Sequence, residues 1–349
     1  MSPSFRTPRN HITPSSSRAS SSPTDGIKQV ASYLNNLSDL QVMQLAVGRK
    51  VGYIPAPEYL KNLVVVCLDA EHFAHPPRML TELGFATYYL SDVRQVCKDP
   101  GPHGEEILKT IYPYHYRMIE SAQFINHAFL HGDPEMSRFG ETRFVTKDEM
   151  SRVLDIIFVN PVDPNDLSRG YCPVLCLGHA IKGDLKMLED EFDFKWKDYG
   201  TIVRTLDTQV FAREKGLSQK QISLKNLCTA CGFTAVNSHT ALNDAMYTLI
   251  AAVQMALTRD HDMNATRPDT DSKPSGKSLN RVIKNLIDPS REVSLGVGIK
   301  KYCTACGRYN HRKPACTAPK ECAICLKAER FDFMKSHITQ LCPMWYRET

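Results

Sequence analysis

The chain has 349 residues, of which 42% are hydrophobic, which suffices for one substantial core and a small additional module. It contains no apolar run of about eighteen residues and no apolar N-terminal leader, so we expect no membrane partner and an intracellular protein, in the cytoplasm, the nucleus or both. The net charge is +5, and twelve cysteines in such a chain favour thiols and metal ligands over a disulfide framework.

Composition divides the chain into four parts. Residues 1–33 begin with a Ser-, Pro- and Arg-rich stretch and are expected to be a disordered N-terminal segment. Residues 34–258 have the composition of an α/β domain, residues 259–300 that of a linker, and residues 301–349 that of a zinc-knuckle-type module.

Hydrophobic periodicity predicts alternating helices and strands, which is typical of an α/β layer fold. Residues 94–146 are the exception, because their periodicity is weak. In chain order, the predicted elements are a helix over Leu40–Val47 behind a capping box of Ser38 and Gln41, strands at Leu63–Leu68 and Glu82–Leu90, a helix at Lys147–Phe158, a strand at Val174–His179, a helix at Asp184–Phe192, a strand at Thr201–Leu206, and helices at Ser223–Cys231, Thr240–Leu257 and 280–287.

Two carboxylates stand at the end of the first predicted strand. Asp69 and Glu71 are two residues apart, so both side chains lie on one face of the sheet. Like charges repel at that distance unless a cation lies between them, and Mg²⁺ or Mn²⁺ prefers such oxygen ligands. The alternative is a strand end that reaches solvent with two hydrated acids.

Two further acids follow histidines at the same spacing of five residues. Asp184 comes after His179 at the end of a predicted strand, and Asp244 comes after His239 at the start of the last long helix. Asp244 interrupts an otherwise apolar stretch, where a charge needs a partner or a metal ion. The alternatives are a helix N-terminal acid at 184, and a capping histidine with a surface acid at 239 and 244.

In this order the motifs resemble the DEDDh family of 3′→5′ exonucleases over about residues 60–257. The chain departs from many members at Ala180, where they have Asn, and at Gly183, where Phe is frequent. The resemblance implies a ribonuclease H-like mixed sheet flanked by helices. The three segments that match the family motifs are Leu68–Glu71, Gly178–Asp184 and His239–Ala245. Three further segments support the match: Glu82–Gly84, Asp207–Thr208 and Ser223–Leu227.

The middle of the chain resembles the insert of a fungal subgroup of this family. The similar residues are His115–Glu120, Asn126 and Phe139–Thr142. Members of the subgroup include the exonuclease linked to quelling, a form of RNA silencing, and a yeast protein linked to mRNA export. A silencing or export protein is therefore an expected partner.

The resemblance also implies roles for individual residues. Asp69, Glu71, Asp184 and Asp244 would hold two Mg²⁺ or Mn²⁺ ions, with Asp69 between them, and the products would be nucleoside 5′-monophosphates. His239 would be the general base. Next to this site, His72 and Phe73 are candidates to stack on or wedge terminal bases, and core packing is the alternative for Phe73.

The C-terminal module contains two sets of four zinc-ligand types. The first, with spacing C-x2-C-x4-H-x4-C, is Cys303, Cys306, His311 and Cys316. The second is a stretched variant made of Cys322, Cys325, His337 and Cys342, and the alternative there is that His337 is not a ligand. By contrast, Cys228 and Cys231 are expected to pack without a metal.

Zinc knuckles usually bind single-stranded nucleic acid, and the module has residues suited to that. Residues 259–349 hold 17 Lys/Arg against 10 Asp/Glu, an excess that favours a polyanion, although a solvated basic tail is the alternative. The basic and aromatic candidates for substrate binding are Arg308, Tyr309, Arg312 and Lys313.

These features favour a metal-dependent 3′→5′ exonuclease acting on single-stranded nucleic acid, with RNA favoured over DNA and zinc knuckles that help to hold the substrate. The alternative is a non-catalytic scaffold of the same fold in RNA silencing or mRNA export. A DNA-directed exonuclease is a third hypothesis.

Overall fold

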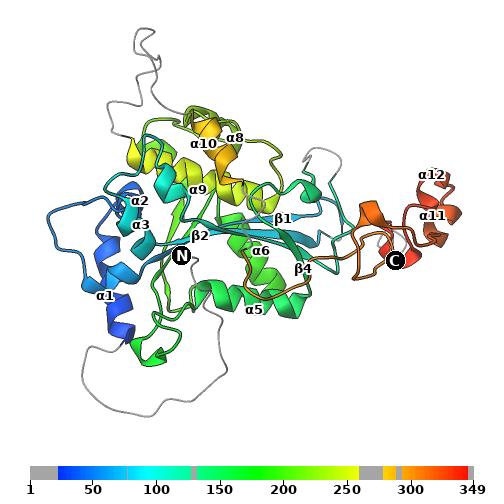
Figure 1. Ribbon diagram of the computed structural model, residues 1–349, viewed down its shortest axis with the longest axis horizontal. Helices are drawn as coiled ribbons and strands as arrows, with labels where there is room; N and C mark the ends of the chain where they lie inside the picture. The colour runs from blue at the N-terminus through cyan, green and yellow to red at the C-terminus, as the bar shows by residue number, and fades with distance from the viewer. Residues whose placement is uncertain (1–22, 77, 127–131, 259–277, 288–292, 345–349) are drawn as a thin grey trace, which may run out of the picture.

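The computed structural model describes residues 23–76, 78–126, 132–258, 278–287 and 293–344. Its centre is a six-stranded sheet in the order β4-β3-β2-β1-β5-β6 (Figure 1). The strands are β1 (Val64–His72), β2 (Leu80–Tyr89), β3 (Tyr112–Met118), β4 (Thr142–Val145), β5 (Val174–Gly178) and β6 (Ile202–Asp207).

Strand β1 is the middle of a mixed sheet. It pairs antiparallel with β2 and parallel with β5, while β2 and β3 are antiparallel. The pairs β3–β4 and β5–β6 are parallel. Together with the helices on both faces, this order confirms the predicted ribonuclease H-like mixed sheet.

Helices cover both faces of the sheet, and side chains of β1 point alternately into two cores. Val65 and Cys67 belong to the larger core, whereas Val66 and Leu68 belong to the smaller one, under α5 and α6. Figure 1 shows α8, α9 and α10 on one side of the sheet and α5 and α6 on the other. The helices of the domain are α1 (Pro23–Asn35), α2 (Asp39–Ala46), α3 (Leu90–Val96), α4 (Glu105–Leu108), α5 (Lys147–Phe158), α6 (Lys182–Phe192), α7 (Thr208–Glu214), α8 (Leu224–Ala230), α9 (Ala241–Leu257) and α10 (Leu279–Leu286).

Helix α9 is the central element of the larger core. Every residue from Ala241 to Ala256 is buried, Asp244 included. Its first turn packs so tightly on β2 that a Cβ atom at Gly84 would lie 2.2 Å from the Ala241 carbonyl carbon and from the Leu242 nitrogen. Only glycine fits there, which places the first turn of α9 directly on the sheet.

The structure corrects the prediction for the N-terminal segment. Residues 23–33 form most of α1, and Val30 and Leu34 are fully buried in the larger core. The prediction failed because the polar start of the segment hid the apolar spacing of this helix. Residues 1–22 lie outside the described residues. Ser38 caps helix α2 at its N-terminus and forms the predicted capping box with Gln41.

Residues 94–146, for which periodicity gave no clear elements, supply one edge of the sheet. They form α4, β3 and β4, joined by a turn of 3₁₀ helix at Pro134–Met136. Strand β3 carries a proline, three tyrosines, a histidine and an arginine among its seven residues, so a simple apolar alternation is absent. Its partners on both sides nevertheless fix it in the sheet.

The predicted linker is not a plain connector where it is described. Leu279, Val282 and Ile283 of α10 are buried in the larger core. Ile299 then pairs with Phe144, the middle of edge strand β4, through hydrogen bonds of 2.8 and 2.9 Å. The module that follows, with α11 (Ala323–Lys327) and α12 (Phe331–Met334), lies beyond β4 (Figure 1).

Within the described residues, every helix is too short or too polar to cross a lipid bilayer.

Candidate nuclease site and two Cys/His clusters

The four predicted acids come together at the end of β1. Asp69 and Glu71 share the strand face that α9 covers, as their spacing of two predicted. Asp184 is in the first turn of α6, and its Oδ1 accepts a hydrogen bond of 3.1 Å from the Ala70 nitrogen. Asp244 is in the first turn of α9. We call these four residues the acid cluster.

His239 lies beside the acid cluster on the turn that leads into α9. Its backbone N–H donates a 2.9 Å hydrogen bond to Asp244 Oδ2, and its Nδ1 is 3.9 Å from Glu71 Oε1. Its φ of 62° is in the left-handed region, where a non-glycine residue is strained. Glu71, His239 and Asp244 each offer a ligand atom, and the three atoms lie within 4.8 Å of one another.

Burial and mutual repulsion make this cluster costly in its ionised form. Burial, reinforced by Asp184 and the neighbouring acids, raises the pKa of Asp69 well above its usual range. Burial and the nearby Glu82 raise the pKa of Glu71 to about 9 and that of Asp244 to about 7. Burial also raises the pKa of Asp184 to about 7. A cation in the cluster would reverse these shifts.

Two carboxylate oxygens of the cluster fit a metal ion. Asp69 Oδ2 and Asp244 Oδ1 are buried without a hydrogen-bond partner among the described residues. Buried polar atoms rarely lack a hydrogen-bond partner, because each missing hydrogen bond costs free energy of folding. An all-oxygen donor set with such atoms suits Mg²⁺ or Mn²⁺.

His179, the histidine of the second motif, supports the structure. Its two ring nitrogens contact Thr208 Oγ1 and the Ile222 carbonyl oxygen, each at 2.8 Å, so it ties β5 to α7 and the next loop. The following residue, Ala180, has a φ of 58°, and its N–H donates to Asp207 Oδ1. At Gly183, a Cβ atom would meet no atom within 4 Å.

His72 and Phe73, the candidates for base stacking, differ in their surroundings. Phe73 is buried, with its ring centroid 5.0 Å from that of Phe124, an arrangement that favours core packing. His72 is half-buried, and its carbonyl oxygen accepts a hydrogen bond from Asn126. Phe124 and Asn126 line a cleft together with Glu71, Glu82 and His239.

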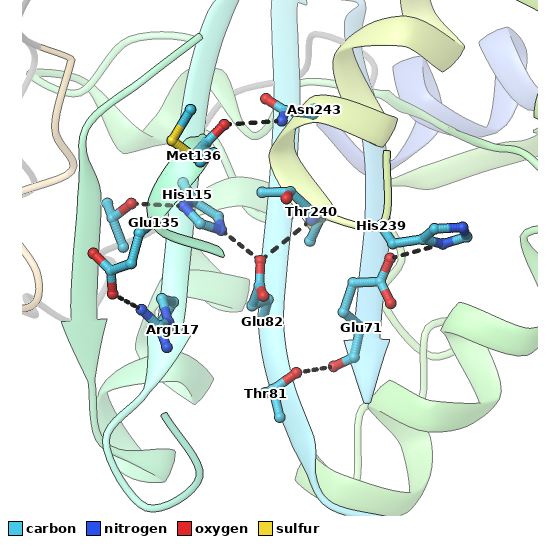
Figure 2. A network of polar contacts seen from close by, with 12 residues as sticks. Glu71, Thr81, Glu82, His115, Arg117, Glu135, Met136, His239, Thr240 and Asn243 are labelled. Atoms are coloured by element: carbon cyan, nitrogen blue, oxygen red, sulfur yellow. Dashed lines mark hydrogen bonds and ion pairs between the residues drawn. The ribbon is translucent and has the colours of Figure 1, made fainter. Parts of the chain in front are cut away.

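Sequence reasoning missed a buried polar network behind the acid cluster. Glu82 lies directly opposite Glu71 in the β1–β2 register and is only 4% exposed. Its Oε2 is 2.9 Å from His115 Nε2, a contact drawn in Figure 2. The same oxygen is 3.4 Å from the Ala241 nitrogen in α9. His115 Nδ1 is 2.8 Å from Thr142 Oγ1. A glutamate two residues before Gly84 was the only sequence signal, and its histidine partner on β3 could not be deduced from spacing.

The cysteines and histidines of the C-terminal module form two separate clusters, each with four ligand atoms within 4.8 Å. The first cluster is Cys303, Cys306, His311 and Cys316, and the second cluster is Cys322, Cys325, His337 and Cys342.

Both clusters suit tetrahedral zinc. Ideal tetrahedral geometry puts sulfur ligands about 3.8 Å apart, and Cys325 Sγ lies 3.8 Å from Cys342 Sγ. A hydrogen bond from His311 lowers the pKa of Cys316 to about 6, which favours the thiolate. His337 lies inside the second cluster, 3.7 Å from Cys325 Sγ. Cys228 and Cys231 belong to no such group among the described residues.

The four predicted substrate-binding residues of the module are not equivalent. Arg308, Tyr309 and Lys313 are exposed, and Tyr309 packs its ring 5.6 Å from that of Tyr302. Arg312 instead turns towards the domain. Its guanidinium binds the Thr142 carbonyl oxygen at 3.0 Å and Glu135 at 3.4 Å, so it is already engaged within the chain.

Comparison with known proteins places residues 64–255, more than half of the chain, in one family model. Its description is "DNA polymerase III subunit epsilon-like, C-terminal domain", of the DEDDh type. No curated protein sequence gives a significant match. Among solved structures, the RNase domain of the yeast Pop2 protein is similar at 12% identity, over 64% of this chain and 82% of that chain. The TM-score of this match is 0.27.

Proposed function

Because the chain belongs to the DEDDh, DNA polymerase III subunit epsilon-like family, we propose that it is a metal-dependent 3′→5′ exonuclease. The substrate would be single-stranded nucleic acid, and the products would be nucleoside 5′-monophosphates. One observation carries the proposal: four acids from β1, α6 and α9 converge beside His239, and two of their buried oxygens have no partner among the described residues. A structural acid cluster would be expected to satisfy those oxygens.

In this proposal the acid cluster holds Mg²⁺ or Mn²⁺. Such ions lower the pKa of a bound water and stabilise the leaving 3′ oxygen. Asp69 and Asp244 would contribute their unpartnered oxygens, while the Ala70 and His239 backbone N–H groups orient Asp184 and Asp244. The imidazole of His239 would accept the proton of the attacking water.

RNA is our favoured substrate. In the second motif, the sequence of residues Gly178–Ile181 is similar to that of RNA-directed members of the family. The exposed Arg308, Tyr309 and Lys313 beside the first cluster are suited to a phosphate backbone and unstacked bases. The zinc clusters would then help to hold the substrate.

A second candidate function is a scaffold without catalysis. The resemblance of the middle segment to the fungal subgroup linked to RNA silencing and mRNA export favours it. Its protein partner would come from one of those processes. The complete acid cluster argues against it, since a fold retained only for binding is free to lose the costly buried charges.

Degradation of end-labelled oligonucleotides tests the proposal. RNA and DNA of one sequence, labelled at the 5′ end, are incubated with the full chain, with and without Mg²⁺ or Mn²⁺. We expect a ladder shortened from the 3′ end, 5′-monophosphate products, and faster loss of RNA.

Two variants serve as controls in that assay. Asp69→Asn removes a charge from the acid cluster and should abolish degradation. Asp148→Asn removes an exposed charge from the first turn of α5 and should not affect it. Equal activity in wild type and Asp69→Asn would refute catalysis at this site. A wild type that binds RNA but degrades neither polymer would favour the scaffold.

A further inference from the structure

The first Cys/His cluster is docked against the edge of the nuclease sheet. Ile299, four residues before Cys303, pairs with Phe144 of β4. Tyr302 then packs its ring 5.5 Å from that of Phe144, and these two residues form a small core with Ala122. The pairing also covers part of an otherwise open strand edge.

Arg312, the residue after His311 of the first cluster, contacts this edge, the turn at residues 132–136 and the segment that leads into the module. Its Nη2 donates to the Thr142 carbonyl oxygen at 3.0 Å, and its Nη1 is 3.4 Å from Glu135 Oε2. Its Nε donates to the Lys300 carbonyl oxygen at 3.2 Å, and its guanidinium carbon lies 5.5 Å from the Phe144 ring centre. A planar guanidinium can make these contacts together, whereas an ammonium group cannot.

The first path from Arg312 towards the nuclease site runs through the turn at residues 132–136. Glu135 in this turn also binds Arg117, which is 1% exposed. The Asp133 carbonyl oxygen accepts hydrogen bonds from Thr240 Oγ1 and Asn237 Nδ2, both at 3.1 Å. The turn therefore holds the residues on either side of His239.

Two further sets of contacts bring the turn at residues 132–136 close to the loop that carries His239. The Met136 carbonyl oxygen accepts hydrogen bonds from Asn237 at 3.0 Å and from Asn243 at 3.3 Å, the latter drawn in Figure 2. A Cβ atom at Gly132 would lie 1.7 Å from the His239 carbonyl oxygen, so the two backbones are in direct contact. A shift of the turn would move the strained backbone of His239.

The second path runs through the sheet. Arg312 holds the backbone of Thr142, whose hydroxyl contacts His115. His115 contacts Glu82, and Glu82 accepts the N–H of Ala241, the first residue of α9. Both paths end within residues 237–244, which set the positions of His239 and Asp244.

We propose that Arg312 is a positioning residue, through which the folded first cluster fixes the loop that carries His239 and the first turn of α9. The proposal rests on the proposed exonuclease function for its kinetic consequence. It revises the sequence-based expectation that Arg312 binds substrate, and it makes the first cluster part of the site's support as well as an aid to substrate binding.

Arg312→Lys tests this directly in the full chain. Lysine keeps the positive charge that a phosphate contact needs, but it loses the planar fork. Lys301→Ala, which removes an exposed charge from the same module, is the matched control. Zinc content is measured in every protein to confirm that the clusters are loaded.

Two readouts separate positioning from substrate binding. Hydrogen–deuterium exchange should rise in peptides covering residues 132–145 and 237–244 of Arg312→Lys, and not in the control. On a short labelled RNA, kcat should fall about 10- to 100-fold with little change in KM, because small displacements of catalytic groups are that costly.

Unchanged exchange in both segments would overturn the proposal, whatever the kinetics. Normal exchange with a raised KM in Arg312→Ala, but not in Arg312→Lys, would identify a phosphate contact instead. Exchange does not depend on turnover, so a wild type without nuclease activity would contradict the proposed function while the exchange comparison still decides the role of Arg312.

Discussion

At the scale of single residues, the four acids of the cluster cost free energy to ionise together, and the same carboxylates are suited to binding a metal ion. Asp69 and Glu71 are separated by two positions on a buried strand, so the sequence alone placed them on one face. The costs became visible only in the structure, where burial raises the pKa values of all four acids. Such perturbed groups concentrate at functional sites.

The metal-free protein should lose stability as pH rises. A carboxyl whose pKa is higher in the folded protein stabilises the fold fully below the unfolded pKa, about 4. That stability is lost as pH rises through the folded values, about 7 for Asp184 and Asp244 and about 9 for Glu71. Thermal unfolding with chelator between pH 5 and pH 9 measures this.

Asp184→Asn should flatten that pH profile, because it removes one of the repelling charges. Mg²⁺ should raise the Tm of wild type more than that of Asp184→Asn. A wild-type Tm that does not fall between pH 5 and pH 9 would show that the acids are not forced into one buried space. Asp148→Asn should follow the wild-type profile.

His239→Asn should slow hydrolysis by about 10²- to 10⁴-fold, the usual contribution of a positioned base. Asparagine tolerates the left-handed φ of 62° better than alanine, so the backbone N–H that holds Asp244 should stay in place. Single-turnover rates at saturating RNA measure the effect. Near-normal turnover at neutral pH would make His239 a structural residue.

At the scale of elements, the sequence predicted what short-range patterns determine. The capping box at Ser38, the uninterrupted β1 and the apolar α9 are encoded locally, and all three are present. Strand β3 was missed because its place depends on partners distant in sequence. The Glu82–His115 pair was missed for the same reason, since β-sheet register decides which buried polar groups meet.

The contact between β2 and α9 can be tested by adding one methyl group. Gly84→Ala should destabilise the domain by about 1–3 kcal/mol, because the Cβ would overlap the α9 backbone. Gly183→Ala is the matched control: it lies in the first turn of helix α6 with open space around its Cβ and should not destabilise the domain. Urea unfolding followed by circular dichroism compares the two. Equal stability in both variants would contradict the close packing of α9 on β2.

At the scale of the whole molecule, the C-terminal module is attached to the domain and is not a free basic tail. The knuckle spacing predicted both clusters, including the stretched second one, because ligand spacing is a local property. The sequence could not predict that the module docks on β4 through Ile299, Tyr302 and Arg312. Pairing with a strand edge and a guanidinium bound within the chain leave no distinctive sequence pattern. The segment 259–277 of the expected linker lies outside the described residues.

The full chain should contain two zinc ions. Thiolates must lose protons to bind, so zinc affinity should fall as pH drops. Elemental analysis measures the content, and Cys303→Ser and Cys325→Ser should each remove one ion from a different cluster. A wild-type content below about one zinc per chain would contradict even the first cluster, and a content near one would reject the second.

The most direct test of the central claim is Mn²⁺ binding to the acid cluster, measured by electron paramagnetic resonance on full-length protein already loaded with zinc. The account predicts about one or two bound Mn²⁺ ions in wild type and in Asp148→Asn, and a loss of that binding in Asp69→Asn. Equal Mn²⁺ binding by wild type and Asp69→Asn would contradict it, because Asp69 contributes one of the two buried carboxylate oxygens that have no partner among the described residues.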